Sequence, residues 1–216
     1  MLDKKQVILF DFDGTIANTI DIVSEIYNKF APSYGFKTID KKEMIHIKSL
    51  SPLQILKDLR KSWLSFIKLP FFIKKIEGEL NRQMESVKFY PGIIELLKRL
   101  KSEGYKLGII SSDTKKNIKK FLKLNDLDFF DFIYTGSFWG KSNLINKFLK
   151  DLDFKPSEVI YIGDEVRDIQ AANKSQIDIV SVTWGFGSKK TLFQHKPNFI
   201  VNKPMDILFF LKKFNV

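Results

Sequence analysis

Four short apolar runs recur along the chain, each flanked by polar or turn-forming residues. They are VILF at 7–10, KLGII at 106–110, EVIYIG at 158–163 and DIVSVTWG at 178–185. Runs that are apolar throughout, rather than alternating, are typical of strands covered on both faces in a parallel sheet. FDFIYTG at 130–136 is a possible fifth strand, and NFIV at 198–201 is a weaker sixth.

The segments between these runs carry apolar residues at helical spacing. The predicted helices span 91–104, 113–127, 141–152, 166–176 and 204–214. The first has Pro91 near its start and Gly104 just past its end, which are the usual positions for these residues around a helix. Strands that alternate with helices of this length imply βαβ units with right-handed crossovers. The pattern therefore predicts an α/β fold with a doubly wound (Rossmann-like) parallel sheet.

Residues 16–88 have a different pattern, with helical periodicity and no convincing strand. Prolines and glycines are expected to divide this segment into about four helical pieces; the dividing residues are Pro32, Gly35, Pro52 and Pro70. Its aromatic residues are expected to form a small core of their own; they are Trp63, Phe66, Phe71 and Phe72. We therefore expect an α/β core made of 1–15 and 89–216, with 16–88 as an inserted helical domain.

Composition narrows the possible classes of protein. A chain of 216 residues fits one domain of ordinary size with an insert. The chain has no cysteine, which excludes disulfide frameworks, thiol nucleophiles and thiolate metal sites, and a reducing cytoplasm is the simplest expectation. The apolar run at 7–10 is too short for a signal peptide, and no stretch approaches the roughly 18 apolar residues of a membrane span.

The chain is basic, with a formal net charge of +11. Such a charge could serve a nucleic acid, a membrane surface or a small anionic substrate. Segment 16–88 and the remainder of the chain are both basic, and neither contains a block of five or six like charges. We interpret the charge mainly as a lysine-rich composition on solvated faces, so no nucleic-acid partner is expected. The oligomeric state, monomer or homodimer, is left open.

Candidate chemistry gathers where the predicted strands end. Ligands of doubly wound sheets collect at the carboxyl ends of the strands. The polar residues expected at this edge are Asp11, Asp13, Gly14 and Thr15, then Ser111, Ser112 and Asp113, then Lys141, then Asp164, Glu165 and Asp168. Converging carboxylates repel one another unless a cation joins them, and an oxygen-only ligand set suits Mg²⁺. A carboxylate nucleophile beside a cation, a lysine and a hydroxyl suits transfer of a phosphoryl group.

The motifs DFDGT, IISS, Lys141 and GDEVRD, in this order, resemble the four motifs of the haloacid dehalogenase superfamily. The likeness covers nearly the whole chain. The stretches around IISS and GDEVRD look like those of the phosphoglycolate phosphatase-like members of subfamily IA. The position and length of segment 16–88 match the helical type 1 cap of these members, so the resemblance implies a cap inserted after the first strand.

The resemblance also implies a role for each matching residue. Asp11 would be the nucleophile and a metal ligand, and Asp13 the general acid and base, with its backbone carbonyl on the metal. Ser111 would bind the phosphoryl group, and Lys141 would neutralise the nucleophile and the phosphate. Asp164 would complete the metal site.

The remaining matches are supporting or substrate-binding positions. Asp168 would support the metal site from nearby, and Gly14 and Thr15 would shape the turn of the first motif. Ser111 and Ser112 stand where the family more often has Thr-Asn, an exchange of one donor for another. Glu165 stands where a serine or threonine is common and would be an additional acid near the metal.

The residue at position 13 separates reactions within the superfamily. Dehalogenase members tend to have an aromatic residue there and phosphonate-cleaving members an alanine, whereas an acid can protonate a leaving alkoxide. The resemblance thus favours a Mg²⁺-dependent phosphatase of a small phosphorylated metabolite, such as phosphoglycolate, acting through an aspartyl phosphate. Two alternatives remain: a phosphomutase resembling β-phosphoglucomutase, and a basic, non-catalytic protein that binds nucleic acid or membranes.

Overall fold

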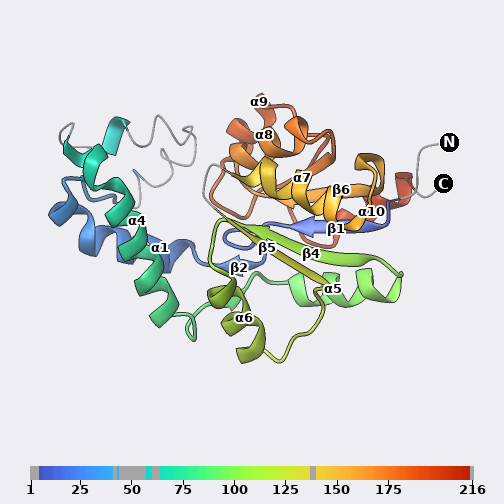
Figure 1. Cartoon of the computed structure of the whole chain (residues 1–216), viewed down its shortest axis with the longest axis horizontal. Coiled ribbons are helices and arrows are strands. Elements are labelled where there is room, and N and C mark those ends of the chain that lie inside the picture. The colour runs from blue at the N-terminus through green and yellow to red at the C-terminus, as the bar shows by residue number, and fades with distance from the viewer. Residues whose placement is uncertain (1–4, 41–42, 44–56, 60–63, 137–139, 215–216) are drawn as a thin grey trace.

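The computed structural model of the chain describes residues 5–40, 43, 57–59, 64–136 and 140–214. Its main sheet has six strands in the order β5-β4-β1-β6-β7-β8, all parallel (Figure 1). Their bounds are β1 (Val7–Phe10), β4 (Lys106–Ser111), β5 (Phe132–Thr135), β6 (Val159–Gly163), β7 (Asp178–Val182) and β8 (Phe199–Val201). The predicted doubly wound parallel sheet is confirmed, including its two weaker strands.

Strand β1 lies inside the sheet and is buried on both faces. Ile8 and Phe10 belong to one apolar cluster, whereas Val7 and Leu9 belong to another. Because successive side chains of a strand point to opposite faces, a run that is apolar throughout requires helices on both sides. The first cluster is covered by α5 (Ile93–Ser102), α6 (Lys115–Leu124) and α10 (Asp206–Phe214), and the second by α7 (Lys141–Leu152), α8 (Val166–Lys174) and α9 (Lys189–Gln194).

The fourth apolar run of the sequence differs from its prediction at one end. The strand predicted over 178–185 ends at Val182, and the residues after it form a loop. Helix α9 was not predicted from the sequence, because six residues are too few to display a helical period. None of the helices that the structure describes is long and apolar enough to cross a membrane.

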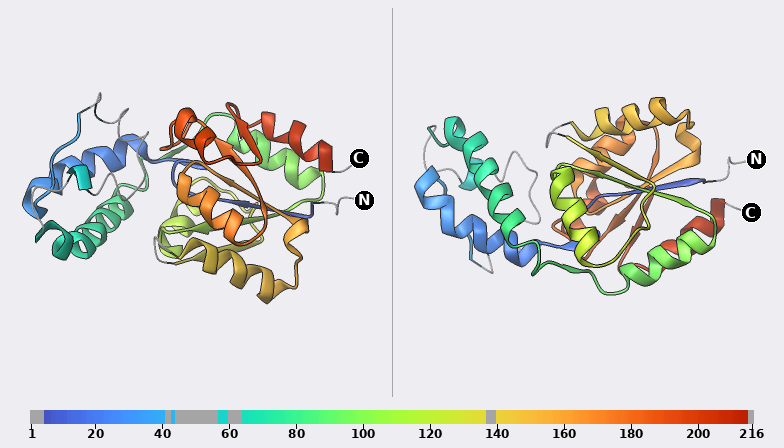
Figure 2. Two further views of the ribbon diagram at one scale, coloured as in Figure 1. Left: turned by 90° about the horizontal axis from the view of Figure 1, so that it is seen from above. Right: turned by 60° about the horizontal axis from the view of Figure 1, so that its bottom comes forward.

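Helices α1 (Ile20–Phe30) and α4 (Leu64–Arg82), with the short 3₁₀ helix η1 (Ala31–Tyr34), form a lobe that lies beside the sheet and its flanking helices (Figure 2). We call this the helical lobe. It joins the rest of the molecule through an antiparallel pair of two-residue strands, β2 (Ala17–Asn18) and β3 (Lys88–Phe89). The expectation that segment 16–88 contains no strand is therefore wrong at its two ends, where strands of two residues leave no period to detect.

Two further expectations for the helical lobe are wrong. Pro70 does not end a helix but lies inside α4. A proline inside a helix costs about 3 kcal/mol, and packing of the flanking apolar residues outweighs that cost here. Phe71 is 67% exposed, whereas Phe72 stacks against Tyr34 and Phe36. Neighbouring residues on a helix point about 100° apart, so only one of the two phenylalanines faces the lobe's core.

The remaining expectations for the lobe fall partly outside the described residues. Trp63 and the side chain of Phe66 are outside the described part of the chain. Pro52, another predicted helix break, is outside it as well. Pro32 lies in η1, and Gly35 ends this short helix with a φ of 81°, so both residues interrupt the helical pattern where expected.

Candidate active site

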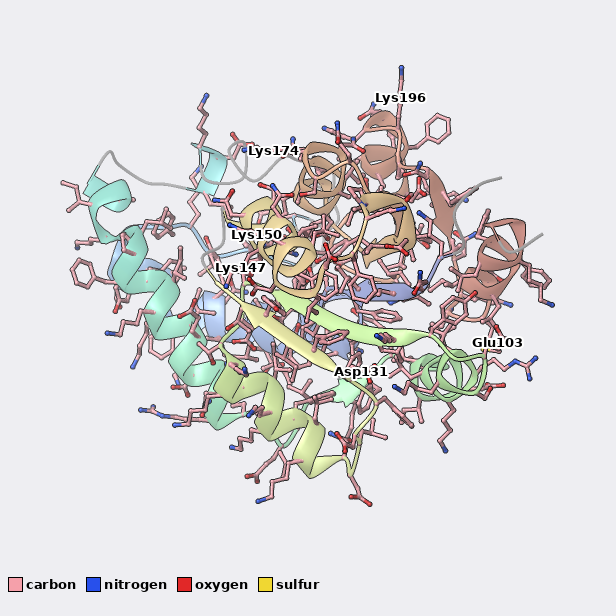
Figure 3. All side chains as sticks on the ribbon, turned by 45° about the vertical axis from the view of Figure 1, so that its right-hand side comes forward. Glu103, Asp131, Lys147, Lys150, Lys174 and Lys196 are labelled. Atoms are coloured by element: carbon pink, nitrogen blue, oxygen red, sulfur yellow. The ribbon has the colours of Figure 1, made fainter. Side chains whose placement is uncertain are left out.

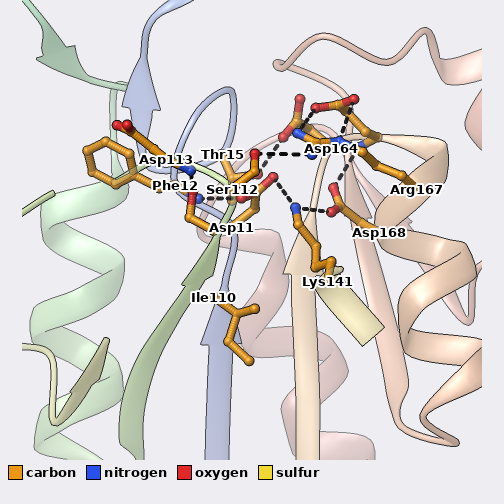
Figure 4. A network of polar contacts seen from close by, with 12 residues as sticks. Asp11, Phe12, Thr15, Ile110, Ser112, Asp113, Lys141, Asp164, Arg167 and Asp168 are labelled. Carbon is orange, nitrogen blue, oxygen red and sulfur yellow. Dashed lines mark hydrogen bonds and ion pairs between the residues drawn. The ribbon is translucent and has the colours of Figure 1, made fainter. Parts of the chain in front are cut away.

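Asp11 directly follows β1, so the strand presents it at the carboxyl edge of the sheet. The side chain is 1% exposed. Its Oδ1 accepts a hydrogen bond from the backbone N–H of Phe12 at 2.8 Å, and its Oδ2 accepts one from Lys141 Nζ at 2.7 Å (Figure 4). Burial raises the pKa of Asp11 to about 6, although the Lys141 ammonium opposes this shift. The carboxylate is therefore ionised at neutral pH and aimed by two donors.

Lys141 is the first residue of α7 and is buried. A positive charge at a helix N-terminus opposes the helix dipole, so local structure alone does not favour a lysine here. Burial lowers its pKa, but Asp11 and Asp168, which both accept hydrogen bonds from Nζ, outweigh burial and raise that pKa. Lys147 and Lys150 on the same helix lie on its outer surface (Figure 3). Lys141 is thus the lysine of α7 that reaches the site.

Asp164 follows β6 and is fully buried. Its Oδ1 accepts a hydrogen bond from Thr15 Oγ1, and its Oδ2 accepts one from the backbone N–H of Phe186, both at 2.7 Å. Oxygen atoms of Asp11, Asp164 and Asp168 all lie within 4.8 Å of one another. Burial, followed by repulsion from Glu165 and Asp11, raises the pKa of Asp164 well above its usual range. A compact, buried, oxygen-only cluster whose members repel one another is chemically suited to a hard divalent cation.

Three glycines surround Asp164 so closely that no side chain fits. A Cβ on Gly14, whose φ is +79°, would lie 2.4 Å from Asp164 Oδ2. A Cβ on Gly185 would lie 2.2 Å from the same oxygen, and one on Gly187 would lie 2.2 Å from the backbone oxygen of Asp164. The loop after β7 therefore wraps Asp164 with its backbone. Trp184 in this loop donates a hydrogen bond from Nε1 to the Thr15 carbonyl at 3.1 Å, which joins the loop to the first motif.

Asp13 lies two residues beyond Asp11 and is half-buried. Its Oδ1 is buried without a hydrogen bond to any described residue. Burial, followed by the charges of Asp113 and Asp11, raises the pKa of Asp13 well above its usual range. These surroundings favour the protonated form of Asp13, whereas the Lys141 ammonium favours the charged form of Asp11. The two carboxyl groups are thus suited to different tasks, as in other pairs of acids whose pKa values are separated by their surroundings.

The loop after β4 brings hydroxyl groups to the same edge. Ser111 is buried, and its Oγ accepts a hydrogen bond from the backbone N–H of Asp113 at 3.0 Å. Burial raises the pKa of Asp113 to about 6, against hydrogen bonds from the Thr114 amide and Asn117 that favour the charged form. Because β4 and β6 both pair with β1, their loops flank Asp11 from opposite sides.

The family model of haloacid dehalogenase-like hydrolases matches residues 8–182. The phosphoglycolate phosphatase of Synechococcus elongatus is 30% identical over 94% of this chain and 95% of its own length. The chain belongs to the haloacid dehalogenase-like hydrolase family. Pyrophosphatase PpaX of Bacillus mycoides is 27% identical over 98% of this chain and 99% of its own.

Solved structures have the same fold as this haloacid dehalogenase-like hydrolase. A family member from Streptococcus pneumoniae superposes with a TM-score of 0.75 at 24% identity, over 95% of this chain and 98% of its own. A proposed β-phosphoglucomutase from Thermotoga maritima gives a TM-score of 0.67 at 24% identity, over 96% and 99% of the two chains. Both likenesses concern the fold alone.

The residues expected from the sequence gather at one edge of the sheet, and Glu165 and Asp168 are among those with partners that the sequence did not indicate. Glu165 was expected near the metal, yet both of its carboxylate oxygens are bound by Arg167, from Nε at 2.9 Å and from Nη2 at 2.6 Å. Asp168 accepts a hydrogen bond from the Glu165 backbone N–H at 2.9 Å and so also caps α8. In this haloacid dehalogenase-like hydrolase, Asp168 combines an ordinary helix-capping role with a place in the acidic cluster.

Two features of the site were missed from the sequence. Arg167 is one of 36 basic residues, and nothing in GDEVRD indicates that its side chain turns back toward Glu165. The contacts of Gly185, Phe186 and Gly187 to Asp164 involve backbone atoms and leave no side-chain pattern. The glycines of TWGFG, which come just after a strand, were the available signal, since glycine in such a place often permits close backbone approach.

Proposed function

We propose that the protein is a Mg²⁺-dependent phosphatase that hydrolyses a small phosphorylated metabolite. The observation that carries this proposal is the pairing of two acids with different surroundings. Lys141 binds Asp11 and favours its charged form, while burial and neighbouring acids favour the protonated form of Asp13 two residues away. The similarity to a phosphoglycolate phosphatase along 94% of the chain supports the same reaction class.

The acidic cluster fits the metal that the family implies. Carboxylate oxygens of Asp11 and Asp164, with the backbone carbonyl of Asp13, would hold Mg²⁺, and Asp168 would support them. When bound, Mg²⁺ offsets the charge that develops on the phosphoryl oxygens. The fit rests on the donor set, which is buried, all oxygen and within 4.8 Å for Asp11, Asp164 and Asp168.

In the proposed first step, an Asp11 carboxylate oxygen attacks phosphorus in line with the leaving group. A bond forms between this oxygen and phosphorus, and the bond from phosphorus to the leaving oxygen breaks. Asp13 gives its proton to that oxygen, which leaves as an alcohol. Lys141 and the Ser111 hydroxyl donate hydrogen bonds to the phosphoryl oxygens and fix their position.

In the second step, the Asp13 carboxylate takes a proton from a water molecule, which attacks the phosphorus of the aspartyl phosphate. The bond between phosphorus and Asp11 breaks, inorganic phosphate leaves, and both acids return to their starting states. Segment 16–88 is proposed as a cap domain over the core formed by 1–15 and 89–216. Its closure would exclude water during the first step.

The substrate is proposed to be phosphoglycolate-like, on the basis of similarity to the Synechococcus enzyme. Arg60 and Lys48, candidate contacts for the distal end of the substrate, lie outside the described residues. The third candidate, Arg82, pairs with Glu79 on the surface of α4. With no cysteine in 216 residues, a reducing compartment is suitable, and we propose the cytoplasm.

Hydrolysis of a generic aryl phosphate tests the proposal. We expect turnover with Mg²⁺, none with EDTA, and a loss of at least about 1,000-fold for Asp11→Asn, because the amide cannot attack phosphorus. Asp131→Asn, which changes an acid at the opposite edge of the sheet, is the matched control and should keep its activity. Absence of metal-dependent turnover, or full activity of Asp11→Asn, would contradict the mechanism.

A panel of phosphorylated metabolites, including phosphoglycolate and pyrophosphate, then identifies the substrate class. Release of inorganic phosphate supports a phosphatase. An isomerised sugar phosphate without phosphate release would instead indicate a phosphomutase. Steeply salt-dependent binding to DNA or anionic vesicles without any turnover would indicate a binding protein on the same fold.

A further inference from the structure

Arg167 connects two loops of the active site through its guanidinium group. It is the second residue of α8, and its side chain is 10% exposed. Nε and Nη2 each donate a hydrogen bond to a different oxygen of Glu165. Nη1 donates a third to Ser112 Oγ at 3.1 Å, so Arg167 bridges the loops of two strands (Figure 4). We call the three residues Glu165, Arg167 and Ser112 the clasp.

The clasp crosses the end of β1. Ser112 follows β4, whereas Glu165 and Arg167 follow β6. These strands pair with β1 on its two sides, and the residue after β1 is Asp11. A bond from Ser112 to Arg167 therefore fixes the width of the space in front of Asp11, where the phosphoryl group would be placed.

The direction of each hydrogen bond gives Ser112 a defined task. A hydroxyl has one hydrogen to donate and two lone pairs to accept with. Since Ser112 Oγ accepts from Arg167, its own hydrogen remains available for an acceptor in the site. Accepting from a cation also polarises the hydroxyl and strengthens the bond that it donates. This bond is strongest when its acceptor is an anionic oxygen, such as one on a phosphoryl group.

Glu165 makes this arrangement specific for arginine. The planar guanidinium matches a carboxylate through two parallel bonds and still has a third direction for Ser112. A lysine ammonium lacks this fixed fork and cannot hold both partners in the same geometry. The positive charge of Arg167 also offsets part of the repulsion that Glu165 adds to the cluster of Asp11, Asp164 and Asp168.

We propose that Arg167, oriented by Glu165, is a positioning residue that sets the Ser112 hydroxyl to bind the phosphoryl group of the substrate. The inference rests on the proposed phosphatase function and adds residues to its phosphate-binding site. It differs from a purely structural contact between two loops, because it assigns the effect of Arg167 to the hydroxyl of Ser112.

Binding of inorganic phosphate to the Mg²⁺-loaded protein, measured by calorimetry, tests the clasp without requiring turnover. Arg167→Met and Ser112→Ala should each weaken phosphate binding about tenfold or more, the effect of losing one hydrogen bond to a charged group. The phosphate affinity of the double variant should lie within about twofold of that of the weaker-binding single variant, because both changes remove the same interaction. Arg167→Lys should not restore binding.

Arg99→Met is the matched control, since Arg99 also pairs with a glutamate, Glu103 at 2.7 Å, but lies on the solvent-facing side of α5. It should bind phosphate like wild type. Glu165→Gln, which keeps the shape of the clasp, should weaken binding in the same direction and replaces Arg167→Met if thermal unfolding shows that this variant does not fold. Wild-type affinity in Arg167→Met or Glu165→Gln, or losses that multiply in the double variant, would overturn the clasp.

Kinetics separate this proposal from the proposed function. In aryl phosphate hydrolysis, Arg167→Met should raise KM and the inhibition constant of phosphate much more than it lowers kcat. A wild-type protein without turnover whose phosphate affinity depends on the clasp would refute the phosphatase and keep the clasp. If the wild type is active but Arg167→Met has the same KM and the same inhibition constant of phosphate, the phosphatase stands and the clasp is refuted.

Discussion

The acidic residues at the two edges of the main sheet differ in how they are paired with positive charges. At the edge where the strands begin, Asp178 pairs with Lys5 at 2.6 Å, and Asp131 pairs with Lys101 at 2.9 Å. At the edge where the strands end, Lys141 serves both Asp11 and Asp168, and Asp164 is bound by neutral donors. Figure 3 shows Asp131 and Glu103 on the paired edge.

The direction of the pKa shifts follows this difference. Partial burial disfavours the charged form of Asp131, but the Leu107 amide and Lys101 outweigh it and lower the pKa. Burial and neighbouring acids instead raise the pKa values of Asp11, Asp13 and Asp164. The edge where the strands begin pairs its acids with cations, which stabilises their charged forms. The edge where the strands end keeps several acids buried close together, which is typical of functional sites.

The largest expected effect on stability comes from removing the Lys141 ammonium, which Asp11 and Asp168 share. Lys141→Met leaves Asp11 and Asp168 buried without it, and we expect a loss of about 3–5 kcal/mol in the free energy of unfolding. Lys5→Met on the paired edge should cost less, about 1–2 kcal/mol, because Asp178 is 27% exposed and can be hydrated. Urea unfolding at pH 7 in EDTA measures both. Equal losses would contradict the distinction between the edges.

The next effect concerns the glycines around Asp164. Gly185→Ala would place a Cβ 2.2 Å from Asp164 Oδ2, so this carboxylate must move. We expect aryl phosphate hydrolysis to fall about 100-fold, the usual result of a displacement of about 1 Å in a catalytic site. Gly78→Ala is the matched control, because a Cβ there meets no atom within 4 Å. Comparable activity in the two variants would show that Asp164 tolerates displacement.

A smaller effect, of opposite sign, is expected at Asp113. Its pKa in the folded protein is about 6, above the 3.8 of an unperturbed group, so ionisation opposes folding as pH rises through this interval. Asp113→Asn should therefore raise the free energy of unfolding by about 1–2 kcal/mol at pH 7 without metal. The gain should disappear near pH 4, where wild-type Asp113 is neutral. A destabilised variant at pH 7 would contradict the raised pKa.

The smallest effect is expected on the paired edge. The pKa of Asp131 is lowered on folding, so its charge contributes stability above its unfolded pKa and loses it as pH falls through the folded value. Asp131→Asn should lower the free energy of unfolding at pH 7 by less than about 1 kcal/mol, since the pair is partly exposed. This deficit should vanish in acid. The two aspartate-to-asparagine changes thus shift stability at pH 7 in opposite directions.

The elements that could be predicted from the sequence are those whose apolar residues follow a recognisable pattern. The run at 7–10 indicated β1, because four successive apolar residues followed by turn-forming residues suit a short strand that is covered on both faces. The helix predicted over 141–152 matches α7 at both ends. Strands β2 and β3 have two residues each, and their existence depends on a partner about 70 positions away, so no local pattern could reveal them.

The same distinction applies to the site. Asp11, Asp13, Asp164 and Lys141 were found because their order along the chain resembles a family, and the topology of the sheet explains why they meet. The pairing of Glu165 with Arg167 depends on side-chain directions that a sequence does not contain. The two phenylalanines at 71 and 72 are a similar case, since composition alone cannot say which one faces inward.

The β2–β3 pair is a junction at which the helical lobe could be replaced by a different insertion. Asn18 and Lys88 are partners in one antiparallel register, so the chain enters and leaves the lobe at a single point. A two-residue turn could in principle join these strands as a hairpin and omit the whole insertion. The junction would require redesign, because Ile26, Leu80 and Met84 pack on the core that would remain. Grafting a different insertion onto the same two strands would retain the acidic cluster at the carboxyl edge of the sheet and exchange the lobe that is proposed to cap it.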